Sequence, residues 1–304
     1  MKDLFIIPQS EKSIVAKIKF GNILEIGKID IPFNSKSVVS ENELIVTLCF
    51  DSKVLRIFDI NGNLIHEKNN FSYKALAYKE NTIFLGGDNK IISECEKGEL
   101  FSIVDLNDLE FQLKNIKLPI RVMDGKSIDD ILINSNELIL VDNVVFPKYL
   151  LRYDITMTNN PIHLDTDDLP NNGTYEHIIK GDINNEWLAL FSSTAGMYGS
   201  SQYITIEGKH AGTLSTHVFR YDERRASSPL INNSTFKFID ICLIHNYLFI
   251  IRTDGFGYVD LNNQISNNNF IKLSTKLNGF NRMLKTNSND LILINEYDYE
   301  LVEL

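Results

Sequence analysis

One short phrase recurs six times along the chain: an asparagine, one variable residue, and then at least three apolar residues. The copies begin at Asn42, Asn81, Asn136, Asn185, Asn246 and Asn289. Their spacing of about 40 to 60 residues is that of one supersecondary unit carrying insertions of variable length. The repeat predicts an array of similar units.

Each copy has the pattern of a β-hairpin. Asparagine tolerates the left-handed backbone of tight turns, and the apolar run that follows suits a strand buried on both faces. Apolar segments such as 73–78 and 128–133 precede the asparagines. Downstream of them an apolar residue is followed by aspartate, at Asp59, Asp105, Asp154, Asp222 and Asp260. Each unit therefore has four short antiparallel strands, A to D, with asparagine in the A–B turn and aspartate leading into the C–D turn.

Four-stranded units of this kind are the blades of a β-propeller. We therefore predict an all-β fold, a β-propeller of four-stranded antiparallel blades. The B strands number seven and the A strands six, so we prefer seven blades to six. We expect one domain over residues 1–304, with partial blades at 3–31 and 279–304 that close the ring. The segment from Val54 to Ile65 resembles blade sequences of bacterial six- and seven-bladed β-propeller repeat proteins, and no specific enzyme family is matched.

Composition, the N-terminal segment and the cysteines indicate the cellular compartment of the protein. The 40 acidic and 30 basic residues give a net charge of −10, which argues against nucleic acid and anionic lipid as partners. Apolar runs are too short to cross a bilayer, and Pro8 interrupts the first of them before any signal-peptide cleavage site. The odd set Cys49, Cys95 and Cys242 lies in apolar segments, as reduced core residues do. We expect a cytoplasmic protein.

The longest insertions predict a functional face. In a blade, the D–A and B–C connections emerge on one side of the disc, here called the loop face. A B–C connection of about twenty residues is expected between Thr194 and Leu214, with candidate binding residues Tyr198, Tyr203 and His210. An equal alternative is an extended hairpin that only lengthens the blade, because residues 202–207 alternate like a strand.

Further polar candidates lie in the predicted D–A loops. Arg121 and Asp124 are expected as a polar pair near the channel mouth, and a surface ion pair is the default for them. Asp165, Asp167 and Asp168 are a weak candidate for a hard cation, although solvated loop acid is preferred because the calcium-loop spacing is incomplete. Aspartates that follow B strands would make the loop face negative and favour a basic partner. These aspartates are Asp51, Asp88, Asp142 and Asp254.

No catalytic motif is present in the sequence, so we expect no catalytic residues and no cofactor. The preferred hypothesis is a non-enzymatic protein-binding propeller that uses its loop face. One alternative is an enzyme acting on sugars or lactones, which requires carboxylates or histidines converging at the channel mouth. Another is a bacterial accessory protein that neutralises a toxin.

Overall fold

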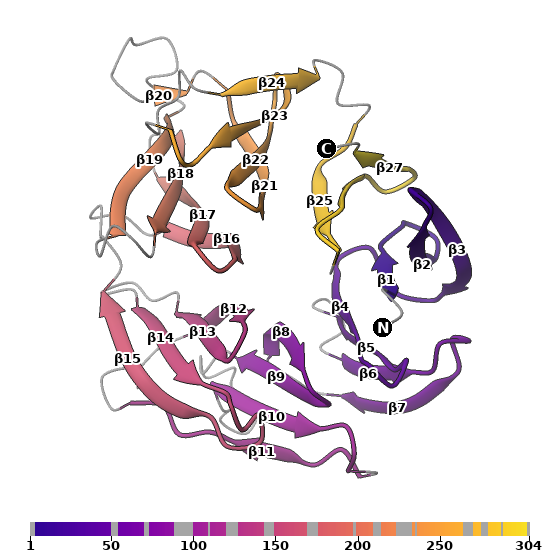
Figure 1. The fold of residues 1–304 in the computed structure, drawn as a ribbon. Coiled ribbons are helices and arrows are strands. Elements are labelled where there is room, and N and C mark those ends of the chain that lie inside the picture. The colour runs from indigo at the N-terminus through magenta and orange to yellow at the C-terminus, as the bar shows by residue number, and fades with distance from the viewer. Residues whose placement is uncertain are drawn as a thin grey trace.

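The computed structural model contains β-strands and no helix in the residues that it describes. Strands gather into seven sheets arranged as a ring (Figure 1). The prediction of an all-β propeller with seven blades is therefore confirmed. None of the described residues forms a helix long and apolar enough to cross a membrane. The described residues are 4–49, 54–69, 73–87, 100–108, 110–119, 127–142, 149–168, 176–196, 199–208, 214–222, 233–234, 236–263, 270–274, 279–286 and 288–302.

The sheets follow one another along the chain, and each is numbered here in chain order. Sheets 1 to 3 contain β1 (Leu4–Ile7), β2 (Ser13–Lys19) and β3 (Asn22–Ile29); β4 (Ser35–Val39), β5 (Ile45–Cys49), β6 (Val54–Phe58) and β7 (Leu64–Asn69); and β8 (Tyr73–Lys79), β9 (Thr82–Gly87), β10 (Phe101–Asp105) and β11 (Leu113–Asn115). Sheets 4 and 5 contain β12 (Ile128–Asn134), β13 (Glu137–Asp142), β14 (Tyr149–Asp154) and β15 (Ile162–Asp168); and β16 (Glu176–Ile183), β17 (Trp187–Gly196), β18 (Gly199–Gly208), β19 (Leu214–Asp222) and β20 (Asn233–Ser234). Sheets 6 and 7 contain β21 (Phe238–Ile244), β22 (Tyr247–Arg252), β23 (Gly255–Asp260) and β24 (Ile271–Ser274); and β25 (Arg282–Lys285), β26 (Leu291–Ile294) and β27 (Tyr299–Val302).

All six repeat asparagines lie in the connections between the first and second strands of sheets 2 to 7, as predicted. The left-handed backbone falls on Asn81 (φ 60°) and Asn289 (φ 64°). In two other turns Ser135 (φ 53°) and His245 (φ 50°), directly before the asparagine, adopt that conformation. The phrase therefore locates the turn correctly, but the residue with positive φ is not always the asparagine.

Polar side chains at these turns also join neighbouring blades. Asn42 donates from Nδ2 to Asn81 Oδ1 at 2.9 Å, which links sheets 2 and 3. Lys79 donates from Nζ to Asn136 Oδ1 at 2.7 Å, which links sheets 3 and 4. Asn184 donates from Nδ2 to the carbonyl of His245 at 2.7 Å, which links sheets 5 and 6. Turn residues thus contribute to holding the ring together.

Aspartates of the second phrase begin the turn between the third and fourth strands. Asp59, Asp105, Asp154 and Asp260 each accept a hydrogen bond through Oδ1 from the backbone N–H two residues later, at 2.8 to 3.0 Å. This is the Asx-turn geometry in which a short side chain substitutes for a backbone acceptor. The expectation that aspartate leads into the C–D turn is confirmed at these four positions.

The core consists of apolar layers between adjacent sheets, because the second strands of most sheets are largely buried on both faces. All five residues of β5 and all four of β26 are buried. Between sheets 3 and 4, the ring centroids of Phe101 and Tyr153 are 5.6 Å apart. Cys49 and Cys242 are buried free thiols, in agreement with the prediction for these two, whereas Cys95 lies outside the described residues.

Sheets 1 and 7 have three strands each, and they pack against each other. Phe5 and Ile7 of β1 share one apolar cluster with Ile292 and Ile294 of β26. The hydroxyl of Tyr299 donates to Glu25 Oε1 at 2.6 Å. Burial, with this hydrogen bond, raises the pKa of Tyr299 to about 12, so the hydroxyl keeps its proton at neutral pH.

Truncation of an inter-sheet aromatic residue should destabilise the ring strongly. Phe101 is fully buried, so Phe101→Ala should lower the free energy of unfolding by about 3–5 kcal/mol through lost burial and an added cavity. Urea unfolding followed by circular dichroism measures the loss. Met157→Ala is the control, since Met157 is 58% exposed and should change stability by no more than about 0.5 kcal/mol. Equal effects of the two substitutions would contradict this view of the core.

Candidate functional site

Of the five predicted binding residues, the structure describes only Tyr203. Tyr198, His210, Arg121 and Asp124 lie outside the described residues. Tyr203 lies in β18 and is only 5% exposed, so its ring contributes to packing and offers almost no contact area.

The expected twenty-residue loop between Thr194 and Leu214 is wrong. Most of this segment continues β17 and forms β18, which pair without interruption from Trp187 opposite Gly208 to Gly196 opposite Gly199. The adjoining β16 pairs with β17 as far as Thr194, so the whole blade is taller. The alternative of an extended hairpin that lengthens the blade is therefore the correct one, because period-two alternation prevailed over the glycine and serine content.

The carboxylates of the weak metal candidate lie in a strand and not in a loop. Asp165, Asp167 and Asp168 all belong to β15, the outer strand of sheet 4. Asp167 Oδ2 accepts from Arg152 Nε at 2.7 Å, so its charge is already engaged. Among the residues that the structure describes, no group of three or more histidine, cysteine, aspartate or glutamate side chains could hold a metal ion.

Arg152 is a clamp between sheets 4 and 5. Its NH1 donates to Glu137 Oε1 and its NH2 to Glu207 Oε2 of β18, both at 2.8 Å, in addition to the bond with Asp167. Burial opposes the charge of Arg152, but these three carboxylates raise its pKa further above the ordinary value. Burial also raises the pKa of Glu207, because the attraction of Arg152 does not fully offset it. We assign this cluster to stability.

The predicted negative loop face loses one contributor. Asp254 accepts hydrogen bonds from Arg252 Nε and NH2 at 2.9 Å each, and from Lys272 Nζ at 3.0 Å. Asp142 ends β13, and Asp51 and Asp88 lie outside the described residues. Asp254 therefore presents little free charge to a partner.

Charged side chains on the inner strands form a network across the central channel, here called the channel network. Carboxylates of three inner strands each accept a backbone N–H from the inner strand of the next sheet. Asp130 Oδ2 accepts from Gly181 at 2.8 Å, Asp182 Oδ2 from Leu243 at 2.7 Å, and Asp240 Oδ2 from Met283 at 2.5 Å. These side chains satisfy main-chain donors that the inner edge of a sheet would otherwise leave without a partner.

Lysines neutralise the same carboxylates. Lys36 Nζ lies 2.7 Å from Asp130 Oδ1, Lys180 Nζ lies 3.0 Å from Asp240, and Lys285 Nζ lies 2.9 Å from Asp182 Oδ1. Lys74 pairs with Asp129 in the same region. Burial lowers the pKa of Lys180, but Asp240 and Asp182 outweigh it, so the net shift is upward and Lys180 stays charged. The carboxylates that the enzyme hypothesis required do converge here, but these four are each bound to a lysine.

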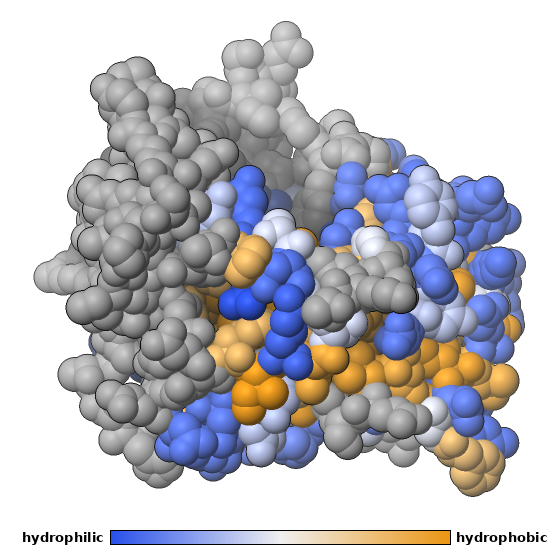
Figure 2. All heavy atoms as spheres, turned by 90° about the horizontal axis from the view of Figure 1, so that it is seen from above, coloured by the Kyte–Doolittle hydropathy of each residue, from blue (hydrophilic) through white to orange (hydrophobic). Residues whose placement is uncertain are grey.

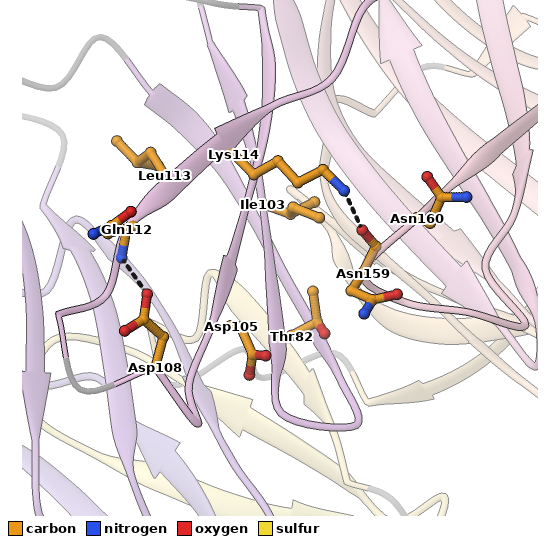
Figure 3. A pocket seen from close by; sticks show the side chains of 9 residues that line it. All are labelled: Thr82, Ile103, Asp105, Asp108, Gln112, Leu113, Lys114, Asn159 and Asn160. Atoms are coloured by element: carbon orange, nitrogen blue, oxygen red, sulfur yellow. Dashed lines mark hydrogen bonds between the residues drawn. The ribbon is translucent and has the colours of Figure 1, made fainter.

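One hollow lies between sheets 3 and 4 near their turns (Figure 3). It has a volume of 460 Å³, and its polar side chains serve the local turns. Asp108 accepts from the backbone of Gln112 at 3.3 Å, and Lys114 Nζ donates to the carbonyl of Asn159 at 2.8 Å (Figure 3). These bonds leave few of its groups for a ligand.

A larger hollow lies between sheets 6 and 7 and has a volume of 790 Å³. Aromatic side chains of β22 and β23 line one side, with the rings of Tyr247 and Tyr258 5.2 Å apart and those of Phe249 and Tyr258 5.6 Å apart. A second hollow of 420 Å³ adjoins it, and both are lined by Leu273, Leu301 and Val302. Together they form one groove beside β27, here called the rim groove.

The rim groove is mainly apolar and accessible. Tyr247 is 40% exposed and Leu273 is 49% exposed. Figure 2 views the side of the disc on which β24 and β27 lie in Figure 1, and it shows apolar side chains gathered in a band with polar ones above it. Sequence reasoning missed this site because its walls come from strands of different blades. The one available signal was that residues 279–304 contain three strands instead of four.

Fold and geometry together define the class of protein, a seven-bladed β-propeller with a ring of paired charges inside and an apolar groove at its rim. Comparisons agree on the fold. The chain is similar to the WD40 domain of Neurospora crassa Pan2, with a TM-score of 0.58 and 12% identity over 99% of this chain and 87% of that one. It is also similar to Kluyveromyces lactis Hsv2, with a TM-score of 0.52 and 12% identity over 99% and 95% of the two chains.

A third similar structure is the extracellular domain of a putative one component system, BT4673, from B. thetaiotaomicron. Its TM-score is 0.52 at 10% identity, and the match covers 99% of this chain but only 38% of that one. No family model and no curated protein matches the sequence. At such low identity these likenesses show the propeller fold and nothing about activity.

Loss of one channel carboxylate should weaken the ring. Asp240→Asn removes the charge that balances Lys180 and one oxygen acceptor, so the free energy of unfolding should fall by about 3–5 kcal/mol. Urea titration measures it. Glu67→Gln is the matched control, because the Arg56–Glu67 pair on sheet 2 is more exposed and should contribute at most about 1 kcal/mol. A loss no larger than that of the control would show that the network is not structural.

The raised pKa of Lys180 predicts a pH dependence. Because its folded pKa lies above the unfolded value, its contribution is complete at neutral pH and is lost as pH rises through the folded value. Wild type should therefore exceed Lys180→Met in stability at pH 7, and the difference should shrink above about pH 10. Paired thermal melts across this range measure the difference. A stability difference that increased with pH would contradict the raised pKa of Lys180.

Proposed function

We propose that the protein is a non-enzymatic β-propeller that binds another protein through the rim groove. The observation that carries this proposal is the groove itself, an exposed apolar surface with an aromatic wall and a volume of 790 Å³ in its larger part. Soluble monomers rarely expose continuous apolar surface of this kind unless it serves an interaction. Tyrosines and a phenylalanine are also the side chains enriched at protein interfaces.

The channel supports a binding role more than a catalytic one. A general acid or base needs a carboxylate that can reach a substrate in the required protonation state. Asp130, Asp182 and Asp240 each hold a lysine and a backbone N–H, so their oxygens are already committed to the scaffold. The convergence of these three carboxylates therefore does not favour a channel-mouth enzyme acting on sugars or lactones.

The loop face is a second proposed surface. Blade 5 extends further at this end than its neighbours, since β17 and β18 have ten residues each. An elevated blade beside the channel mouth guides a partner onto this face, with Tyr198, Arg121 and Asp124 as proposed contacts. His210 falls in the sequence between β18 and β19, in a C–D connection, so it is not proposed as a contact of the loop face. We also propose a single domain and a cytoplasmic location. The net charge of −10 favours a basic partner, which we propose as well.

Site-specific crosslinking tests the rim groove. A photoreactive residue placed at position 273 should crosslink one discrete protein in extracts of the source cell, because Leu273 lines both parts of the groove. The matched control is position 162 of β15, where Ile162 is equally exposed at 53% on another part of the disc. Tyr247→Asp should remove the crosslink by placing a charge on the aromatic wall.

Crosslinks at position 162 of the same yield, or a crosslink at 273 that Tyr247→Asp leaves unchanged, would count against the groove as the binding surface. In that case the same experiment at position 201, on the elevated part of blade 5, tests the loop face.

A further inference from the structure

The outer edge of sheet 7 has main-chain groups available for pairing. In the turn between β26 and β27 the backbone N–H of Asn295 donates to the carbonyl of Asp298 at 3.0 Å, and the strands then pair Leu293 with Glu300 and Leu291 with Val302. Because hydrogen-bonded pairs alternate in an antiparallel ladder, Tyr299 and Leu301 direct their N–H and C=O groups away from β26. The N–H of Tyr299 donates to Asp298 Oδ1 at 2.9 Å, so the groups left for pairing are the C=O of Tyr299 and the N–H and C=O of Leu301. Within the described residues no strand pairs with this edge.

The position beside this edge is a fourth-strand position. Sheets 2, 3, 4 and 6 have a fourth strand there, and sheet 7 stops at its third. Blade 5 shows that an outer edge in this protein accepts additional chain, since the short β20 pairs with β19 as a fifth strand. A segment paired with β27 would run along the rim groove, and Leu273, Leu301 and Val302 line both of its parts.

Charge indicates the chemistry of the occupant. Asp290 lines the larger part of the groove and Glu300 the smaller part. No described lysine or arginine lines either part. The net charge of −10 adds to this field. Lysine or arginine residues of a partner would therefore speed its association and help to fix the register in which it binds, whereas acidic residues would be repelled.

We propose that β27 binds an extended basic and apolar segment of a partner protein as the fourth strand of sheet 7. The C=O of Tyr299 and the N–H and C=O of Leu301 pair with the segment, its apolar side chains fill the groove, and its lysine or arginine side chains face Asp290 and Glu300. Strand addition of this type derives affinity from main-chain hydrogen bonds and specificity from alternate side chains. The inference rests on the proposed function and specifies its partner.

Peptide binding to the full chain tests the pairing directly. The probe is a fluorescein-labelled nine-residue peptide of alternating valine and lysine, and its matched control replaces every lysine by glutamate. Fluorescence anisotropy should show the lysine peptide binding at least about tenfold more tightly than the glutamate peptide. N-methylation of alternate amides in one register should weaken the lysine peptide by about tenfold or more, and methylation in the other register should not.

Two substitutions at one position separate backbone pairing from side-chain contact. Leu301→Pro removes an outward N–H, and proline is tolerated on the outer side of an edge strand. Leu301→Ala removes the same side chain and keeps the N–H. Binding should be lost in the proline variant and fall by less than about fivefold in the alanine variant. Circular dichroism and thermal melting establish that both are folded, and the double variant Asp290→Asn with Glu300→Gln should abolish the preference for lysine over glutamate.

The outcomes distinguish this inference from the proposed function. Crosslinking at position 273 that persists in Leu301→Pro, with no effect of N-methylation, leaves the groove as a binding surface and overturns strand addition. Equal binding of the lysine and glutamate peptides overturns the basic partner. Dimers that Leu301→Pro abolishes would show that a second copy of this chain occupies the edge and would overturn a foreign partner. If the wild-type protein neither forms a crosslink at position 273 nor binds the lysine peptide, both the inference and the proposed function are overturned.

Discussion

The ring depends on how the inner edges of its sheets are satisfied. Each blade presents an edge strand to the channel, and the main-chain donors there have no strand to pair with. Asp130, Asp182 and Asp240 accept the N–H groups of Gly181, Leu243 and Met283, each on the next blade. Lysines from other inner strands then balance the carboxylates. The charges that a search for catalysis would first consider are therefore the charges that join the blades.

The rim has the opposite character. The charged groups at the channel are paired, whereas sheet 7 ends at β27 with main-chain groups directed outward and apolar residues of two blades beside them. Three-stranded sheets at both ends of the chain place this edge where sheet 1 meets sheet 7, held by the apolar cluster of Phe5 and Ile292. The interaction surface that we propose thus follows from the outer edge of sheet 7. It does not require any elaborated loop.

Local chemistry explains which predictions were confirmed. Asparagine and aspartate act on backbone within two residues of themselves, so Asn81 and Asp105 identify their turns from sequence alone. Composition was a poorer guide at Thr194 to Leu214. The glycine and serine content there suggested a loop, but the alternation of apolar and polar residues indicated strands, and most of the segment forms strands. Asp165 to Asp168 were placed in a loop for the same reason and belong to β15. Tyr203 is buried by packing between sheets, which no local pattern reports.

The sequence by itself determined the all-β repeat, the four-strand unit and the positions of its turns, because hydrophobic period and turn chemistry act over a few residues. Only the tertiary structure decided that Lys180 meets Asp240, that Arg152 joins sheets 4 and 5, and that Tyr247, Leu273 and Leu301 border one groove. These contacts join strands far apart in the chain. Their existence depends on the number of blades and on the tilt at which the sheets pack, and neither quantity is encoded by any single segment.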